Sequence, residues 1–256
     1  MITREVVNKI GIEAEVLIRD KNDKLIYPDN YYMAKDDFII LGEIRGKPYS
    51  IVSDVVFEFY KDFYAYKKVA DYNKLSLDLS GYTILTPEFY AEILRKMGSK
   101  EIAKCENIYK TDILNLSDDV LEDGKITGHK VSTGLHIHFS SDIVVTETNE
   151  LEPFIPYKDG LYLKSNVETR EEKETKIYSL LTNTAIKSIV RALDRDIYPK
   201  YKINADLKFR QPGFFERKAW GFEYRSLPFT GYVFDNLTEI VEYCFDLLRK
   251  LEKVLK

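Results

Sequence analysis

Long apolar runs, a basic excess and histidine are all missing or scarce in this chain, which has three histidines among 256 residues. No stretch approaches the ~18 apolar residues of a membrane-spanning helix. The N-terminus, MITREVVNKIGIEAE, lacks the apolar core of a signal peptide. The net charge is −4, whereas surfaces that hold nucleic acid non-specifically are normally basic. We therefore expect neither a membrane nor a direct nucleic-acid partner.

Cysteine is also sparse. The two cysteines, Cys105 and Cys244, lie far apart in the sequence and form no CxxC motif. Cys244 falls on the apolar stripe of a helical pattern, where a buried thiol is the common case. The sequence therefore predicts a buried thiol at this position and a reducing, cytoplasmic location.

The abundant residues are those of a globular protein. Apolar residues make up 45% of the chain and aromatic residues 13%, which argues against disorder. The sequence contains no repeat and no low-complexity segment. A chain of this length is ample for a hydrophobic core, and we expect a single domain spanning residues 1–256.

Apolar and polar residues alternate in several segments, which indicates strands. The clearest is Lys9–Arg19, where Glu13 and Glu15 lie opposite an apolar face. Further strands are expected at two or three places within residues 36–60, at residues 131–142, and around LKFRQPGF and AWGFEYRSLPF. The segment from Asn149 to Lys176 is charged and loop-like, and could serve as a lid.

Three helices are expected. The first begins near Thr86, with Pro87 at the first helical position, and ends near Gly98. The others span about Glu172–Asp194 and about Asn236–Lys253. Strands and helices do not alternate regularly, so we expect an α+β fold: a curved, mainly antiparallel sheet with helices packed on one face. The other face would be left for a cleft.

The stretch VSTGLHIHFSSD holds two of the three histidines, His136 and His138. Side chains two apart in a strand point to the same side of a sheet. Leu135, Ile137 and Phe139 would fill the opposite side. One apolar face and one histidine face suggest a functional site.

The same device recurs in four segments. In each segment, two chemically active side chains lie two or four residues apart. The pairs are Glu13 and Glu15, Asp54 and Glu58, His136 and His138, and Glu223 and Arg225. Two carboxylates two apart in a strand are ~7 Å apart and repel by ~2 kcal/mol at an effective dielectric of about 20. A cation such as Mg²⁺, an arginine or solvent must compensate for this repulsion.

Each set also has an ordinary explanation. Glu13 and Glu15 could form the solvated face of an edge strand, and Glu58 could be a solvated residue. The histidines could be packed core residues, and Glu223 with Arg225 could be a structural ion pair. Arg210 and Lys218 could be surface charges. The joint pattern favours a site over these separate explanations.

In this order, the segments resemble the phage-type carboxylate–amine ligases of the glutamine synthetase-like superfamily. The pattern of these amidoligases is an early G-x-E-x-E strand, a D-x-x-x-E-like strand, a G-x-H-x-H strand and a late R…G-x-E-x-R element. The matching residues here are 11–15, 54–58, 134–138 and 210–225. The resemblance covers the chain from Gly11 to about Pro228 and implies one catalytic domain of the glutamine synthetase type, in the host cytoplasm if the protein is phage-encoded.

The resemblance implies ATP and Mg²⁺ as cofactors and an amide-forming reaction through an acyl phosphate. It implies Glu13, Glu15 and Glu223 as Mg²⁺ ligands, with Glu58 as a further one. Arg225 would bind the transferring phosphoryl group. His136, His138, Arg210 and Lys218 would contact phosphate, metal, or one of the two substrates. An aromatic residue, Trp220 or Tyr224, could stack on adenine, although core packing is an alternative.

Two other functions fit the same residues. A metal-dependent hydrolase or phosphoesterase also combines histidines with carboxylates, but would leave Arg210 and the E-x-R element without a role beyond phosphate binding. A non-catalytic nucleotide-binding protein on the same scaffold would not need all four of these residue pairs to be intact. The partners of a ligase would be a carboxylate and an amine, either small molecules or peptides. The sequence selects neither these substrates nor an oligomeric state.

Overall fold

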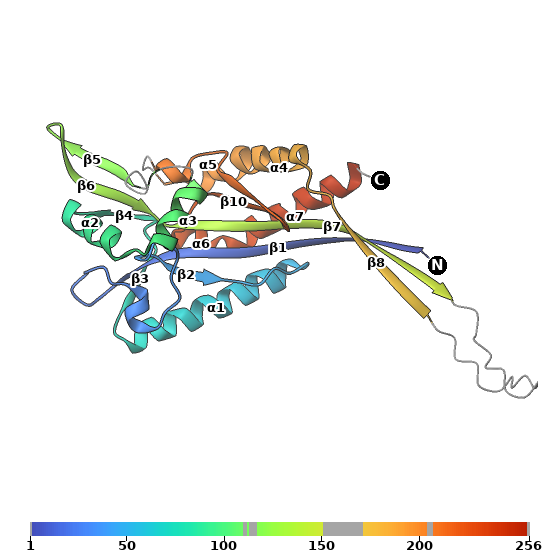
Figure 1. Cartoon of the computed structure of the whole chain (residues 1–256), viewed down its shortest axis with the longest axis horizontal. Coiled ribbons are helices and arrows are strands. Elements are labelled where there is room, and N and C mark those ends of the chain that lie inside the picture. The colour runs from blue at the N-terminus through green and yellow to red at the C-terminus, as the bar shows by residue number, and fades with distance from the viewer. Residues whose placement is uncertain (1, 110–111, 113–116, 151–170, 204–206, 255–256) are drawn as a thin grey trace, which may run out of the picture.

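A seven-stranded sheet forms the centre of the molecule. The computed structural model describes residues 2–109, 112, 117–150, 171–203 and 207–254, and the strand pairings within them are antiparallel. The strand order is β2-β1-β7-β10-β9, with β3 paired to β1 and β8 to β7. The strands are β1 (Ile2–Arg19), β2 (Gly42–Arg45), β3 (Ser76–Asp78), β7 (Gly134–Glu150), β8 (Glu171–Ser179), β9 (Phe215–Lys218) and β10 (Gly221–Pro228). The expected α+β class with a mainly antiparallel sheet is confirmed (Figure 1).

Three helices cover one face of this sheet: α1 (Val52–Tyr72), α4 (Asn183–Asp196) and α7 (Leu237–Val254). In the central part of these strands, Ile10, Ile12, Ala14 and Val16 of β1 and Leu135, Ile137 and Phe139 of β7 pack against these helices in one core. Cys244 of α7 is buried there, as predicted. The opposite face of the same strands therefore carries the glutamates and histidines.

A second, smaller core closes one end of the polar face. Leu17, which follows Glu13 and Glu15 on that side of β1, packs with the segment Phe38–Leu41 and with α2. This region comprises α2 (Pro87–Lys96), α3 (Ser99–Tyr109) and a three-stranded sheet of β4 (Tyr82–Leu85), β6 (Lys125–Ser132) and β5 (Asp118–Glu122). Helix α2 begins as predicted, because the Thr86 hydroxyl accepts a hydrogen bond from the Phe89 N–H.

The predicted strand at Asp54–Glu58 is wrong, because these residues lie in the first two turns of α1. Val55, Phe57 and Phe59 alternate as in a strand, but Phe57 is 66% exposed. The buried residues are Val55, Val56, Phe59 and Phe63, which follow the helical period. Of the two or three strands expected within residues 36–60, the structure contains β2.

The predicted helix at Glu172–Asp194 is wrong in its first half. The chain forms β8, paired antiparallel to β7, up to Ser179. Helix α4 then starts at Asn183, where the Thr182 hydroxyl accepts from the Ala185 N–H. Ile177 is 67% exposed, so the apolar stripe is interrupted before the cap. The proposed lid, residues 149–176, includes residues 151–170, which lie outside the described chain, and its ends belong to β7 and β8.

The remaining elements are short. They are η1 (Pro28–Tyr31), α5 (Tyr198–Tyr201), η3 (Lys208–Arg210) and α6 (Gly231–Asp235). The LKFRQPGF segment therefore begins with the turn η3 rather than a strand, and this turn places Arg210 against β10. Among the described helices, none combines the length and the apolar character that crossing a membrane requires.

Candidate active site

A cavity of about 830 Å³ opens over the polar face of the sheet. Its walls come from six strands of the central sheet, from α3 and from the loop before β2. Glu13, His138, Glu223, Arg225 and Lys218 all line it, although they come from four different strands. Because neighbouring strands pair in register, with Glu13 opposite His136 and Glu223 opposite His138, the three motifs on β1, β7 and β10 meet at one place.

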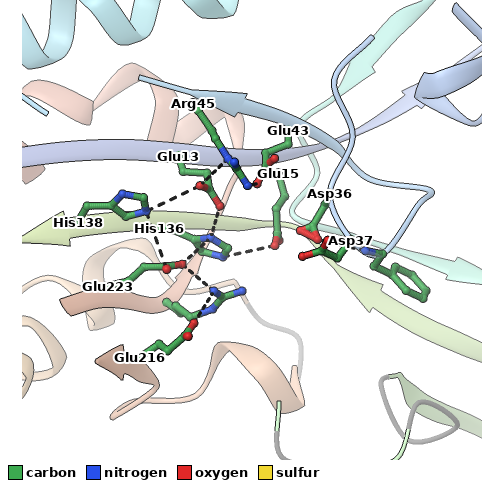
Figure 2. A network of polar contacts seen from close by, with 12 residues as sticks. Glu13, Glu15, Asp36, Asp37, Glu43, Arg45, His136, His138, Glu216 and Glu223 are labelled. Atoms are coloured by element: carbon green, nitrogen blue, oxygen red, sulfur yellow. Dashed lines mark hydrogen bonds and ion pairs between the residues drawn. The ribbon is translucent and has the colours of Figure 1, made fainter. Parts of the chain in front are cut away.

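Glu13, His138 and Glu223 form the only group of possible metal ligands among the described residues, with ligand atoms within 4.8 Å of one another. His138 Nε2 lies 3.8 Å from Glu13 Oε2 and 4.0 Å from Glu223 Oε2 (Figure 2). Both distances are below twice the ~2.1 Å of a Mg²⁺–oxygen contact. His138 Nε2 is buried and has no hydrogen-bond partner among the described residues. The three residues thus fit one divalent cation.

The charge states of this triad suit a cation. Burial alone would raise the pKa of Glu13, but the hydrogen bond and charge of His136 outweigh it and lower the pKa to about 2. His136 acts in the same way against the burial of Glu223, whose pKa lies well below its usual range. Burial lowers the pKa of His138. Two carboxylates and one neutral imidazole therefore face one another.

His136 lies beneath the cavity rather than in its wall, and its side chain is fully buried. Its Nδ1 is 3.1 Å from Glu13 Oε1 and 3.0 Å from Glu223 Oε1. On the other side of the ring, Nε2 is 3.4 Å from Glu15 Oε1 (Figure 2). His136 therefore fixes the two carboxylates of the triad from below, and the two histidines have different positions: His138 faces the cavity and His136 supports it.

The carboxylates around His136 also set its charge. Burial and the nearby Arg225 guanidinium would lower the pKa of His136, but Glu15, Glu13 and Glu223 outweigh both and raise it to about 9. The imidazole is then cationic at neutral pH, with its Nδ1–H between Glu13 and Glu223. A cationic His136 offsets part of the repulsion between the two carboxylates that the sequence spacing predicts.

Arg210 is the second buried support and does not line the cavity. Its guanidinium donates to the Glu15 carboxylate and to the Arg225 carbonyl oxygen, the latter at 3.0 Å, and contacts His136 Nε2 at 3.2 Å. The guanidinium packs flat on β7 at Gly134, where a Cβ atom would lie 2.3 Å from Arg210 Cζ. This close approach explains the glycine of the G-x-H-x-H motif.

Glu15 belongs to this buried layer and not to the triad. Two acidic neighbours of Glu15, Asp36 and Glu43, were missed in the sequence analysis and lie on the polar face of the sheet together with it (Figure 2). Burial and the Glu15 charge raise the pKa of Asp36 to about 6. Burial, Glu13 and Asp36 raise the pKa of Glu43 to about 8, against the effect of Arg45. The segment Gly42–Arg45 has the same alternation as the other motifs, so this signal was present in the sequence.

Cationic side chains border the triad. Lys218 Nζ is 3.3 Å from Glu223 Oε2, and Arg225 Nη1 donates to Glu223 Oε1 at 2.7 Å. Arg45 Nε is 3.1 Å from Glu13 Oε2. All three side chains line the cavity, which therefore presents positive groups on both sides of the ligand atoms. Such a pattern suits an anion that bridges a bound metal.

The two candidate aromatic residues have different environments. Trp220 lines the cavity, is 46% exposed, and its ring centroid is 5.2 Å from that of His138. Tyr224 points into the helix-covered core, where its hydroxyl donates to Asp194 at 2.8 Å. Core packing is therefore the role of Tyr224. Of the two candidates, Trp220 is therefore the aromatic residue that lies next to the triad.

Glu58 does not join the other site residues. It lies on α1, the helix that packs on the opposite face of the sheet, and it pairs with Lys61 at 2.8 Å. Glu58 is absent from the cavity wall. The structure therefore gives it no place beside Glu13 and Glu223, and its assignment as a metal ligand fails together with the predicted strand.

The cavity thus combines a triad of candidate metal ligands, flanking basic side chains and the aromatic ring of Trp220. This set can hold a metal-bound polyanion and neutralise charge on its oxygens. No family model, no curated protein and no solved structure matches the chain. The functional assignment therefore depends on these residues and on their geometry.

Proposed function

We propose that this protein is an ATP- and Mg²⁺-dependent carboxylate–amine ligase. The observation that carries the proposal is the meeting of three motifs from distant parts of the chain, at Glu13, His138 and Glu223–Arg225, on the wall of one cavity. These are three of the four elements through which the sequence resembles the amidoligases. The fourth, Asp54–Glu58, takes no part in the site.

Glu13, His138 and Glu223 would hold the divalent cation. When bound, such an ion neutralises phosphate oxygens and orients the triphosphate. Mg²⁺ and Mn²⁺ both suit a set of two carboxylates and one imidazole. His136 keeps Glu13 and Glu223 ionised and in place, and Arg210 holds Glu15 beside it. These two buried residues position the ligands without touching the substrates.

Lys218 and Arg225 would bind the phosphate oxygens, since both reach the cavity next to Glu223. Trp220 would offer its exposed ring to the adenine base. In the reaction, a carboxylate oxygen of the first substrate attacks the γ-phosphorus and ADP leaves. The amine nitrogen of the second substrate then attacks the acyl carbon, phosphate leaves with that oxygen, and the nitrogen loses a proton.

The test is a screen of amino acids, peptides and amines with ATP, Mg²⁺ and the purified chain. We expect ADP release that requires both a carboxylate and an amine, and a product lighter by one water than the two reactants combined. Oxygen-18 in the carboxylate should appear in the released phosphate. Hydrolysis of a phosphoester without nucleotide would support the hydrolase instead. Nucleotide binding without turnover of any pair would support the non-catalytic protein.

Two variants separate the site from the fold. His138→Asn should weaken Mn²⁺ binding, measured by calorimetry, by about 10- to 100-fold or more, because loss of a direct ligand should cost at least as much as loss of a residue that supports one. The matched control is His129→Asn, at the third histidine, which contacts Ser117 and Asp119 at the three-stranded sheet and does not line the cavity. Equal Mn²⁺ affinity in both variants would remove the triad from the proposal.

A further inference from the structure

The N-terminal half of β1 has a strand partner on one side only within the described residues. On that side, β7 pairs with β1 from Ile2 to Ala14 in continuous register. On the other side, β2 pairs with residues 13–16, and Tyr49 bridges to Ile10. No strand of the described chain lies beyond this bridge, along residues 2–9. Figure 1 shows this part of β1 running with β7 and β8 out past the helices.

The backbone groups at this edge can be identified from the last bridge. The Ile10 N–H donates to the Tyr49 carbonyl oxygen, and the Tyr49 N–H donates to the Ile10 carbonyl oxygen, both at 2.9 Å. Ile10 therefore directs its N–H and C=O away from β7. Alternate residues of a strand face the same way, so Asn8, Val6 and Arg4 direct theirs outward as well.

This edge is continuous with the candidate active site. Lys9 and Pro48, at the start of the edge, both line the cavity. Gly11 separates Pro48 from the triad: a Cβ atom at Gly11 would lie 3.4 Å from Pro48 Cβ and 3.5 Å from His138 Cβ. Strands in a sheet are ~4.8 Å apart, so a strand added to β1 would lie about 10 Å from the β7 backbone. A long side chain or a chain terminus spans that distance.

We propose that the edge of β1 binds an extended peptide, whose terminal residue enters the cavity as a substrate. The peptide would add as a further strand beside Asn8, Val6 and Arg4, and main-chain hydrogen bonds would supply its affinity. This inference rests on the proposed ligase function and narrows its substrate class from small molecules or peptides to peptides.

The edge is open to an added strand, and its charged neighbours favour a peptide over a second copy of this chain. Proteins use proline and β-bulges to block an edge, but residues 2–9 contain no proline and their pairing with β7 shows no bulge. The edge is also flanked by exposed Arg4, Glu5 and Lys9, whereas the centres of subunit interfaces are depleted in charge. A peptide that binds through its backbone hydrogen bonds is compatible with these charged neighbours.

The experiment compares Val6→Pro with Val6→Thr. Proline removes the outward N–H and blocks an added strand, yet an edge position tolerates it because the lost N–H does not pair with β7. Threonine keeps the N–H and the β-branched shape. Each full-length variant is incubated with a mixture of random octapeptides, and retained peptides are identified by mass spectrometry. Amide hydrogen exchange is then measured with the best retained peptide, after far-UV circular dichroism has shown that both variants fold.

We expect the wild type and Val6→Thr to retain the same peptides, with slowed exchange at Asn8, Val6 and Arg4. Val6→Pro should bind them about tenfold more weakly or worse, as the loss of two or three hydrogen bonds implies. Retention of no peptide, or equal retention by both variants, overturns the inference. So does dimerisation that Val6→Pro abolishes while peptide binding is unchanged, since the edge then serves a second copy.

The two proposals fail in different ways. If ATP-dependent joining of small molecules proceeds equally in wild type and Val6→Pro and no peptide binds, the ligase stands and the peptide site falls. If peptides bind at the edge but never stimulate ADP formation with any amine or carboxylate, the peptide-binding edge stands and the ligase falls.

Discussion

Adjacent residues on the two faces of the central sheet can be equally buried and yet chemically opposite. Glu15 and Val16 are adjacent in β1 and both are 0% exposed, and the same holds for His136 and Ile137 in β7. The apolar face is filled by helices, whereas the polar face is filled by ion pairs. On the polar face, His138 Nε2 and Glu15 Oε1 are buried, and neither has a hydrogen-bond partner in the part of the chain that the structure describes. Burial alone therefore does not mark a core, and unmet hydrogen-bonding capacity distinguishes the site.

The largest effect on stability should come from the apolar face. Phe139 is fully buried and stacks on Phe222, with ring centroids 4.6 Å apart. Phe139→Ala should lower the free energy of unfolding by about 3–5 kcal/mol, measured by urea denaturation, and leave the Mn²⁺ affinity of the folded protein unchanged. Trp220→Ala, at the half-exposed cavity rim, is the control and should cost far less. Similar losses in both would contradict the division into two faces.

The next effect tests the buried layer under the cavity. Arg210→Met removes the guanidinium that pairs with Glu15 and leaves this buried carboxylate with His136 as its remaining cationic neighbour. Removal of one partner of such a pair costs about 3–5 kcal/mol, and methionine keeps part of the volume over Gly134, so we expect about 3 kcal/mol. The double variant Glu15→Gln/Arg210→Met should recover part of this loss. A double-mutant cycle by urea unfolding measures the coupling, and additive losses would contradict a direct pair.

These contrasts also explain what the sequence could predict. In β1, β7 and β10 a two-residue period with one apolar face was sufficient to place Glu13, His138 and Glu223 on one side, because a strand fixes the direction of its side chains. It was insufficient at Asp54–Glu58, where a short apolar run fits both a strand and the start of a helix. Only the longer pattern, up to Phe63, separates the two.

The different roles of the site residues could be recognised only from the three-dimensional structure. Nothing in the sequence distinguishes His136 from His138, since both have the same spacing and the same face. Their difference arises because β10 crosses beside β7 and brings Glu223 over His136, while η3 brings Arg210 beneath it. Asp36 also reaches the site from a loop, through a tertiary contact that no local period encodes.

The pH dependence of the free energy of unfolding should distinguish the polar face from the apolar one. The pKa of Glu43 is raised to about 8 in the folded protein, so the folded state retains a proton that the unfolded state releases above its ordinary pKa of about 4.5. The stability linked to Glu43 is therefore complete at low pH and is lost as the pH rises towards 8.

Glu43→Gln removes this titration. Between pH 5 and pH 8 the wild type should lose on the order of 2 kcal/mol more stability than the variant, a value reduced by solvent screening beside the cavity. Urea denaturation at the two pH values measures the difference. Tyr66→Phe, a neighbouring change without a carboxylate, controls for packing. Parallel pH profiles for the wild type and Glu43→Gln would show that this carboxyl group titrates in its ordinary range.

The smallest effect should be at Glu58, the carboxylate that the sequence pattern wrongly grouped with the site. Its contact with Lys61 is an i, i+3 pair on a helix, with the lysine 58% exposed, and such pairs contribute about 0.5 kcal/mol or less. Glu58→Gln should therefore shift the free energy of unfolding by no more than that and leave Mn²⁺ affinity unchanged. Glu223→Gln, the same change on the polar face, should weaken Mn²⁺ binding about tenfold or more, because it removes a ligand charge. Calorimetric titration of both variants decides the matter: weaker metal binding in Glu58→Gln would bring α1 back to the site, and the separation of the two faces would fail.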